Sequence, residues 1–326
     1  MTENRINVDG PLWDQSTFLG RLKHFAWMTD FRTVVVRESK LHEAKDLVDK
    51  YRIGLQTPGV TKEEVIYAKK LYDSSFHPDS GELQNVFGRM SFQVPGGMSI
   101  TGAMITFYRT NTAVIFWQWV NQSFNALVNY TNRNAESDID AKRIAIAYTS
   151  ATTSAVVTAL GLKAILAKSA GSLMQRFVPF AAVAAANMVN IPLMRQSELI
   201  DGIVVSDENG NKITQSRYAA VKGISQVVLS RIFMATPTML GIPVVMEYLE
   251  RYPVIKRMTW THAPIQVFLC GVVLCASVPI GCALFPQRSC ITVDKLRIMD
   301  KDKYDELVGK FGDSQLPERL YFNKGL

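Results

Sequence analysis

The sequence predicts an all-α, multi-pass membrane protein with about five transmembrane helices and a helical N-terminal soluble region. Two observations carry this prediction. The 326 residues are 48% hydrophobic and only 20% charged, and their mean hydropathy is +0.05, which is apolar for a soluble enzyme. Long uncharged runs begin only after residue 89, and several of them approach the roughly 20 apolar residues that a membrane helix needs. Buried helices of a soluble core use shorter runs, so the membrane is favoured.

These runs define a transmembrane domain at 96–287, between a water-facing or interfacial helical region at 1–95 and a C-terminal tail at 288–326. Five spans fit the runs best: about 98–120, 143–164, 175–194, 223–246 and 264–286. An odd number of spans implies that the N-terminal region and the C-terminal tail lie on opposite faces of the membrane. Lys and Arg are spread almost evenly over the two sets of loops, so the positive-inside rule assigns no side.

The N-terminal region contains helical patterns mixed with charge. Thr61 followed by Glu64 predicts a capping box that starts a helix. The aromatic segment at 13–27, which includes Arg21 and His24, fits a helix lying at lipid headgroups and equally well a packed soluble helix. A cleavable presequence is not expected, because acidic residues interrupt the first fourteen positions, and any organelle address should lie within the chain.

Motifs for enzyme chemistry are missing from the sequence. It contains no H-E-x-x-H, no G-x-x-x-x-G-K-[ST] and no G-x-S-x-G, so an enzyme is not predicted. The four cysteines have no C-x-x-C spacing, and no basic cluster is interleaved with aromatics; we therefore expect no metal, no cofactor and no nucleic-acid partner. His77, Asp79 and Glu82 are capable of holding a cation, but Pro78 and Gly81 beside them favour a turn.

The segment from Trp117 to Asn134 carries the strongest functional signal. At about 100° per residue, five of its carboxamides fall within about 80° of one another on a helical wheel. They are Gln118, Asn121, Asn125, Asn129 and Asn132. Such a stripe must face protein or a water-filled path, because unpaired polar groups are costly in lipid. Carboxamides both donate and accept hydrogen bonds, which suits a neutral or zwitterionic solute. Alternatively, the stripe holds helices together by hydrogen bonds between them.

Other polar residues at apparent membrane depth extend the candidate site. Arg109 and Arg231 interrupt apolar runs and would oppose a solute carboxylate, or snorkel, or bind backbone carbonyls. Asn187 and Asn190 share a face of the predicted third span. The second span is rich in Ala, Ser and Thr, which is typical of closely packed helices.

Several motifs resemble those of one known family. They are FHPDSGE at 76–82, the segment Trp117 to Asn134, Met194-Arg195-Gln196 with Glu198-Leu199, YFNKGL at 321–326, and Trp13-Asp14-Gln15 with TFLGR at 17–21. Together they resemble the sideroflexins from about residue 10 to the C-terminus. Ser80 stands where the histidine motif of that family usually has Thr, and it keeps the hydroxyl.

The resemblance implies a multi-pass protein of the mitochondrial inner membrane that carries amino acids, serine above all, for one-carbon metabolism, with a link to iron and haem balance. An older label of the family implies tricarboxylates instead. Combined with the polar stripe, it leads to the hypothesis of a serine carrier in the lipid bilayer whose amides bind the solute. Citrate or iron transport and a non-transporting membrane scaffold are the alternatives. The oligomeric state is not predicted.

Overall fold

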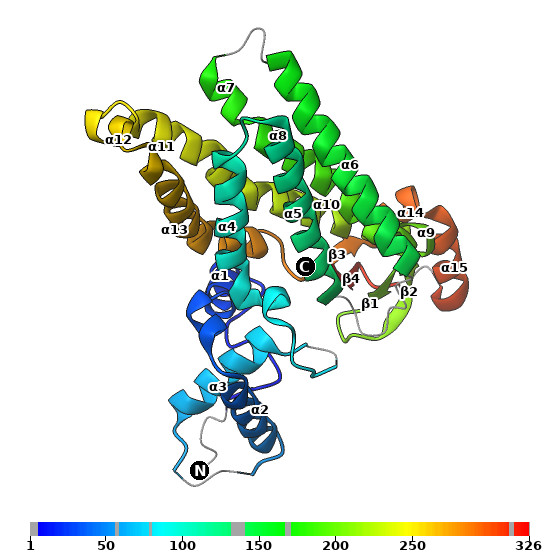
Figure 1. The fold of residues 1–326 in the computed structure, drawn as a ribbon. Coiled ribbons are helices and arrows are strands. Elements are labelled where there is room, and N and C mark those ends of the chain that lie inside the picture. The colour runs from blue at the N-terminus through cyan, green and yellow to red at the C-terminus, as the bar shows by residue number, and fades with distance from the viewer. Residues whose placement is uncertain are drawn as a thin grey trace.

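A computed structural model describes residues 6–55, 59–77, 80–131, 141–166, 171–312 and 316–325. Helices dominate it, as the sequence predicts, and they are arranged in three parts (Figure 1). A bundle of long helices forms the centre, the N-terminal helices lie beneath it, and a small sheet with two helices lies at its side. The bundle is the part that positions the candidate site.

The N-terminal region is a small helical unit with its own hydrophobic core. Its elements are α1 (Phe18–Met28), η1 (Phe31–Val35), α2 (Glu38–Arg52) and α3 (Lys62–Ser75). The predicted capping box starts α3: the Thr61 side chain accepts from the backbone N–H of Glu64, and the Thr61 N–H donates to Glu64 Oε2 at 2.8 Å. Leu41 and Val48 of α2 are fully buried against Val65 of α3. This packing gives the region an interior independent of the bundle.

The expected span at 98–120 is wrong, because the chain turns back at residues 107–110. Two short 3-10 turns, η2 (Val86–Gly88) and η3 (Met90–Phe92), lead into α4 (Gln93–Thr106), and α5 (Asn111–Thr131) follows the turn. The end of α5 returns to the start of α4, where Asn85 Nδ2 donates to Thr131 Oγ1 at 2.8 Å. A helix of 14 residues such as α4 is about 21 Å long, short of the ~30 Å hydrocarbon core. The single span is therefore a hairpin.

The remaining long helices include four that are long and apolar enough to cross a membrane. These stretches are Ala145–Leu166, Leu173–Met194, Arg217–Leu249 and Thr259–Ala283. The elements that form them are α6 (Ala141–Leu166), α7 (Ser172–Arg176), α8 (Val178–Met194), α10 (Arg217–Thr236), the π-helical η4 (Pro237–Gly241), α11 (Ile242–Leu249), η5 (Thr259–Thr261) and α13 (His262–Ala283). They cover the last four spans that the sequence predicts. The short helices α9 (Gln196–Asp201) and α12 (Pro253–Arg257) lie in the connections.

Small residues allow α6 and α8 to pack closely. Ala147, Ala151, Ala155 and Ala159 follow one another at four-residue intervals along α6, and all four are fully buried. Ala159 packs with Val178 and Ala182 of α8. This close approach is what the small residues of the second span predict.

The N-terminal region and the C-terminal segment lie at the same end of the bundle, so the expectation of opposite faces is wrong. Arg21 Nε of α1 donates to the carbonyl of Ala283, the last residue of α13, at 2.9 Å. Lys324, near the C-terminus, lies close enough to Arg21 to interact electrostatically. The α4–α5 hairpin explains the difference, because it adds a second passage along the bundle where the sequence predicts one.

A four-stranded antiparallel sheet was not expected from the sequence. Its strands are β1 (Ile203–Ser206), β2 (Lys212–Ser216), β3 (Arg288–Thr292) and β4 (Arg319–Asn323), in the order β2-β1-β4-β3. Helices α14 (Val293–Met299) and α15 (Lys301–Phe311) accompany it. The signal was present in Asn209-Gly210, a dipeptide typical of hairpin connections, and Gly210 has a positive φ of 89°, which favours glycine.

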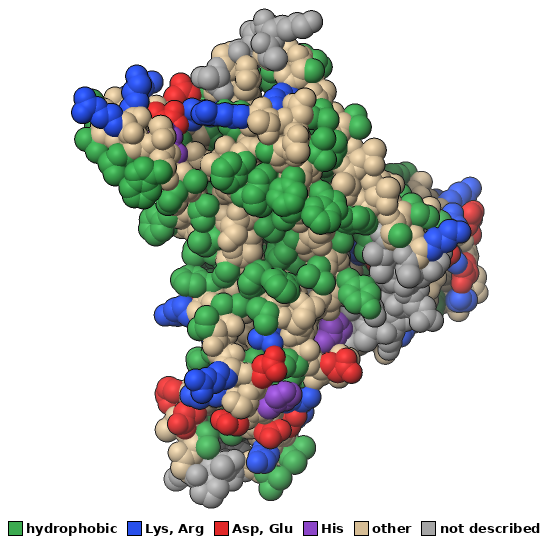
Figure 2. Space-filling model, viewed as in Figure 1, with side chains coloured by type: hydrophobic (Ala, Val, Ile, Leu, Met, Phe, Trp, Pro, Cys, Tyr) green, Lys and Arg blue, Asp and Glu red, His purple; other side chains and the backbone are tan. Residues whose placement is uncertain are grey.

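The surface of the bundle matches a lipid environment. Figure 2 shows hydrophobic side chains across the middle of the molecule, with charged side chains gathered towards its ends and over the sheet. Exposed apolar residues on the bundle include Phe116 of α5, Val157 of α6 and Phe268 of α13. An apolar belt between two charged zones is typical of a protein that spans a bilayer.

Candidate functional site

The carboxamides of α5 face the interior of the bundle. Gln118 and Gln122 are each only 2% exposed, whereas Phe116 and Trp119 on the opposite side of the helix are about half exposed. Asn121 and Asn125 are partly buried on the same inner side as Gln118. The stripe therefore faces protein and not lipid, as its cost in hydrocarbon requires.

Three of these amides each have a buried atom without a hydrogen-bond partner in the described ranges. The atoms Gln118 Oε1, Asn121 Nδ2 and Gln122 Nε2 are buried without a partner there. A nearby hydroxyl on α5 behaves differently, because Ser123 Oγ lies 2.9 Å from the Tyr148 hydroxyl of α6. Bonding between helices is thus available to this helix, but these three amide atoms do not use it. This geometry favours a solute or water path over interhelical bonding as the purpose of the stripe.

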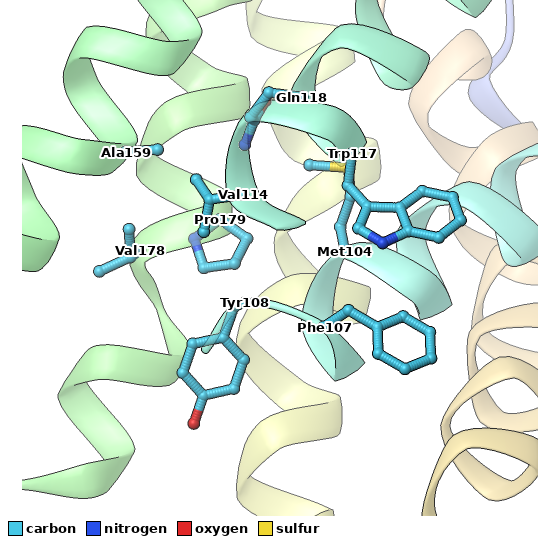
Figure 3. Close-up of a pocket in the computed structure, with 9 residues that line it drawn as sticks. All are labelled: Met104, Phe107, Tyr108, Val114, Trp117, Gln118, Ala159, Val178 and Pro179. Atoms are coloured by element: carbon cyan, nitrogen blue, oxygen red, sulfur yellow. The ribbon is translucent and has the colours of Figure 1, made fainter. Parts of the chain in front are cut away.

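Gln118 lines a small cavity where four helices meet. Figure 3 shows its side chain beside Met104 of α4, Val114 of its own helix, Ala159 of α6 and Val178 of α8. Phe107, Tyr108, Trp117 and Pro179 complete the lining. The cavity has a volume of about 10 Å³, which is room for about one water molecule. Gln118 is the only amide in this lining, and Tyr108 and Trp117 are the other lining residues whose side chains carry a polar atom.

Asn187 and Asn190 are carried by α8, which packs beside α6 and α10. Asn190 is 4% exposed. Helices α5 and α8 run in the same direction along the bundle (Figure 1), and Gln118 of α5 and Val178 at the start of α8 line the same cavity, which gives the two helices a common reference level to within about one or two helical turns. From this level, Asn125 and Asn187 lie about 10 Å and about 13 Å further along their helices. The structure therefore places amides of two neighbouring helices at similar depth.

Arg109 does not belong to this site. It is exposed in the turn between α4 and α5, and its carbonyl accepts a hydrogen bond from Lys163 Nζ at the end of α6. The prediction that it lies at membrane depth is wrong, because Arg109 marks the turn that divides the expected span. Arg231 does lie within a long apolar helix, α10, but its electrostatic neighbours are Cys282 and Lys324 and not the amides of α5.

Two predicted residues fall outside what the structure describes. Asn132 lies beyond the described ranges, and for Asn129 only the helical backbone is described. Sequence reasoning also missed one residue, Gln122. Gln122 is four positions after Gln118 and hence on the same side of the helix. This spacing is the sequence signal that could have identified it.

Charged residues lie at the end of the bundle nearest the cavity. Arg176, at the end of α7, pairs with Glu250, which caps α11, at 2.7 Å between Nη2 and Oε2. His262 at the start of α13 lies 3.7 Å from the same carboxylate. Val178 and Pro179 of the cavity follow Arg176 within three residues. The ion pair thus links the segment that leads into the cavity to α11.

The other candidate features of the N-terminal region lie away from the amides. At 77–82 the chain forms a turn, as expected: the Gly81 N–H donates to the His77 carbonyl at 2.9 Å, and Gly81 has a positive φ of 65°. Pro78 and Asp79 lie outside the described residues. A surface groove of about 460 Å³ is lined by Trp13, Trp27 and Lys62, among others. No group of three or more potential metal ligands occurs in the described parts of the chain.

Taken together, the bundle and its buried amides define a multi-pass membrane protein with a polar interior helix. Comparison with known proteins is consistent with this class. The family described as "Sideroflexins" matches residues 7–326. "Sideroflexin-2" of Drosophila melanogaster is 57% identical and that of Homo sapiens 56% identical, each over 321 residues and 98% of both chains. "Sideroflexin-1" of Homo sapiens is 53% identical over 323 residues, with the same coverage.

The chain therefore belongs to the sideroflexins. The match extends over nearly the whole chain, including the N-terminal region and the sheet as well as the bundle. No solved structure matches the chain significantly.

Proposed function

We propose that this sideroflexin carries small neutral amino acids, serine foremost, across the mitochondrial inner membrane. Membership in the family supports a role as a transporter of the mitochondrial membrane. The observation that carries the proposal is a set of three buried amide atoms on α5, Gln118 Oε1, Asn121 Nδ2 and Gln122 Nε2, which have no hydrogen-bond partner in the described parts of the chain. Supply of serine to one-carbon metabolism and the link to iron and haem balance belong to the same proposal.

Unpaired amides inside an apolar bundle are costly, by roughly 1–3 kcal/mol each. A carrier recovers this cost whenever a polar solute occupies the path, because amide C=O groups accept from an ammonium or hydroxyl and amide N–H groups donate to a carboxylate. Serine offers all three groups. In this function the amides at 118, 121, 125, 129 and 132 of α5 bind the solute, with Asn187 and Asn190 of α8 at the same depth.

Passage of a solute requires helix movement. The cavity beside Gln118 holds about one water, so serine does not fit in this conformation. Helix α5 must move away from α4 or α8 for the amides to become accessible. The π-helical turn η4 and the prolines around it provide an irregular segment on the neighbouring α10–α11 span, which is the kind of feature found in discontinuous helices of transporters.

The test is uptake of labelled serine by purified protein in liposomes. Replacing both Gln118 and Gln122 by Leu should reduce uptake by about tenfold or more, because each lost hydrogen bond to a solute is worth about 1 kcal/mol or more. The pair Asn125→Leu and Asn129→Leu should abolish uptake while the protein remains inserted. Ser123→Ala is the matched control on the same helix and should transport normally, since Ser123 bonds Tyr148 instead of facing the amides.

Unchanged uptake by both double variants would refute the path along α5. A panel of serine, citrate and ferrous iron in the same liposomes distinguishes the proposed solute from the alternatives. If wild-type protein moves none of them but copurifies stoichiometrically with another membrane protein, the scaffold is correct and the carrier is not.

A further inference from the structure

A second group of buried polar residues lies at the end of the bundle that meets the sheet, apart from the amides of α5. Lys324 follows β4 and is only 2% exposed. Its backbone N–H donates to the carbonyl of Gln287 at 2.9 Å, and Arg195 Nη1 donates to its carbonyl at 2.7 Å. These contacts hold the Lys324 backbone between the sheet and the bundle, and its side chain extends into the interior.

Cations from distant parts of the chain converge on Lys324. Arg21 of α1, Arg195 after α8 and Arg231 of α10 all lie within electrostatic reach of its ammonium group. Burial and then these cations, partly offset by Cys282, lower the pKa of Lys324. Three positive side chains therefore gather around a fourth, the buried Lys324.

Two of these cations are already compensated. Arg195 pairs with Glu198, with Nε 2.9 Å from Oε2. Arg21 donates to the carbonyls of Ala283, Gln15 and Ser16, each at 2.9 Å, and has Asp14 as an electrostatic neighbour.

Arg231 and Lys324 are not compensated in this way. Neither forms an ion pair within the described ranges. Lys324 Nζ has only long contacts, at 3.3 Å to Gln287 Oε1 and 3.5 Å to the carbonyl of Gly325. For Arg231, no hydrogen bond to a described residue is found, and its electrostatic neighbour is the thiol of Cys282.

A neutral donor lies on the same side of α10. Ser230 is 5% exposed, and its Oγ is buried with no partner in the described parts of the chain. Gly223 of α10 faces the Lys324 backbone, because a Cβ at that position would lie 3.5 Å from Lys324 Cα. Ser230 is seven residues further along, on the same helical face and about 10 Å higher. Arg231, the next residue of α10, is an electrostatic neighbour of the Lys324 ammonium group, as is Cys282 of α13.

We propose that Arg231, Lys324 and Ser230 form a binding site for a phosphate group. Among the described residues, the two cations have no ion-pair partner and the hydroxyl has no hydrogen-bond partner. The three groups supply positive charge and hydrogen-bond donors, and a phosphate supplies the missing negative charge and acceptors. The guanidinium fork of Arg231 matches two oxygens of a phosphate. This site is separate from the proposed carrier path, because its residues belong to α10 and the C-terminal segment and not to α5.

The phosphate has two possible sources with the same chemistry. Cys282, an electrostatic neighbour of both Arg231 and Lys324, directly precedes Ala283, where the membrane span Thr259–Ala283 ends. The site therefore lies near the depth of lipid headgroups. The phosphate of an anionic lipid and a soluble phosphate both reach such a depth. The experiment below separates them.

The test measures thermal unfolding of the full chain in nanodiscs of phosphatidylcholine, with inorganic phosphate titrated at constant ionic strength. Phosphate should raise the unfolding temperature of the wild type. Arg231→Gln and Lys324→Met should weaken the apparent phosphate affinity by about tenfold or more, the worth of a charge-assisted hydrogen bond. Arg231→Lys should keep part of the response. Lys163→Met is the control, because Lys163 lies at the opposite end of the bundle and bonds Asn111.

A second measurement distinguishes loss of phosphate binding from misfolding of the variants. Without phosphate, Lys324→Met should be as stable as the wild type or more stable, because it removes repulsion between buried cations. Nanodiscs containing phosphatidylglycerol identify the source: a lipid occupant stabilises the wild type and removes its response to soluble phosphate, whereas a soluble occupant leaves that response intact. The proposal is overturned if neither phosphate nor phosphatidylglycerol stabilises the wild type, or if the neutralised variants respond as the wild type does.

Discussion

At the scale of single residues, the N-terminal region holds two ionisable side chains away from water, His24 partly and Lys69 almost completely. His24 of α1 has a buried Nδ1 atom with no partner in the described ranges. Lys69 of α3 is 3% exposed, and its Nζ lies 2.7 Å from Asp73 Oδ2 and 2.8 Å from the Val8 carbonyl. Burial, with a smaller effect of the positive charge of Lys69, lowers the pKa of His24 to about 4.

This depressed pKa predicts that the N-terminal region loses stability towards unfolding in acid. The unfolded chain binds a proton at His24 near pH 6.5, but the folded protein does so only near pH 4. The contribution to stability is therefore complete above pH ~6.5 and is lost progressively as the pH falls towards 4. Thermal unfolding followed by tryptophan fluorescence should show this loss in the wild type, and His24→Phe should show a smaller one. Equal pH profiles for the two proteins would contradict the assignment to His24.

At the scale of elements, close contact between α4 and α13 holds the hairpin against the bundle. A Cβ on Gly102 of α4 would lie 2.7 Å from Val267 Cγ2 and 2.9 Å from Val267 Cα. One turn later, Thr106 Oγ1 donates to Gln266 Oε1 at 2.7 Å. Which helix Gly102 contacts depends on how α4 folds back, and local sequence pattern does not specify it.

Gly102→Ala should destabilise the protein by about 1–3 kcal/mol, since the added methyl group meets the backbone of α13 and the helices must separate. Gly161→Ala in α6 is the matched control. Nothing lies within 4 Å of a Cβ at that position, so the change should be neutral or stabilise the helix by up to about 1 kcal/mol. Unfolding temperatures in detergent provide the measurement. A Gly102→Ala protein as stable as the wild type would show that α4 and α13 are not packed this closely.

At the scale of the whole molecule, the α4–α5 hairpin decides which faces the ends of the chain occupy. The N-terminal region, the sheet and the C-terminal segment meet at one end of the bundle. The turn at Arg109 and the α11–α13 connection, which contains Lys256, lie at the other end (Figure 1). The sequence analysis counted the two uncharged runs on either side of Arg109 as one span, whereas the structure has two helices there. This single difference changes the number of passages from odd to even, so the two ends of the chain lie on the same face.

Cysteine labelling tests this arrangement. We expect Lys50→Cys and Lys301→Cys, both exposed, to react with a membrane-impermeant maleimide from the same face of a sealed proteoliposome. Arg109→Cys and Lys256→Cys should react only from the other face. The labelling background of the wild type, which has four cysteines of its own, is the control. Labelling of Lys50→Cys and Lys301→Cys from opposite faces would restore the odd number of spans.

The membrane class, the last four spans, the α3 capping box and the inward-facing carboxamides follow from residue pattern alone, because each depends on local periodicity or on the cost of polar groups in lipid. The family follows from short motifs for the same reason. Tertiary structure decided what depends on contacts between distant segments: the reversal at Arg109, the pairing of β1 with β4, and the separation of Arg231 from the amides. Hydropathy measures how much apolar surface a segment carries, but not where the chain reverses or which neighbour covers that surface.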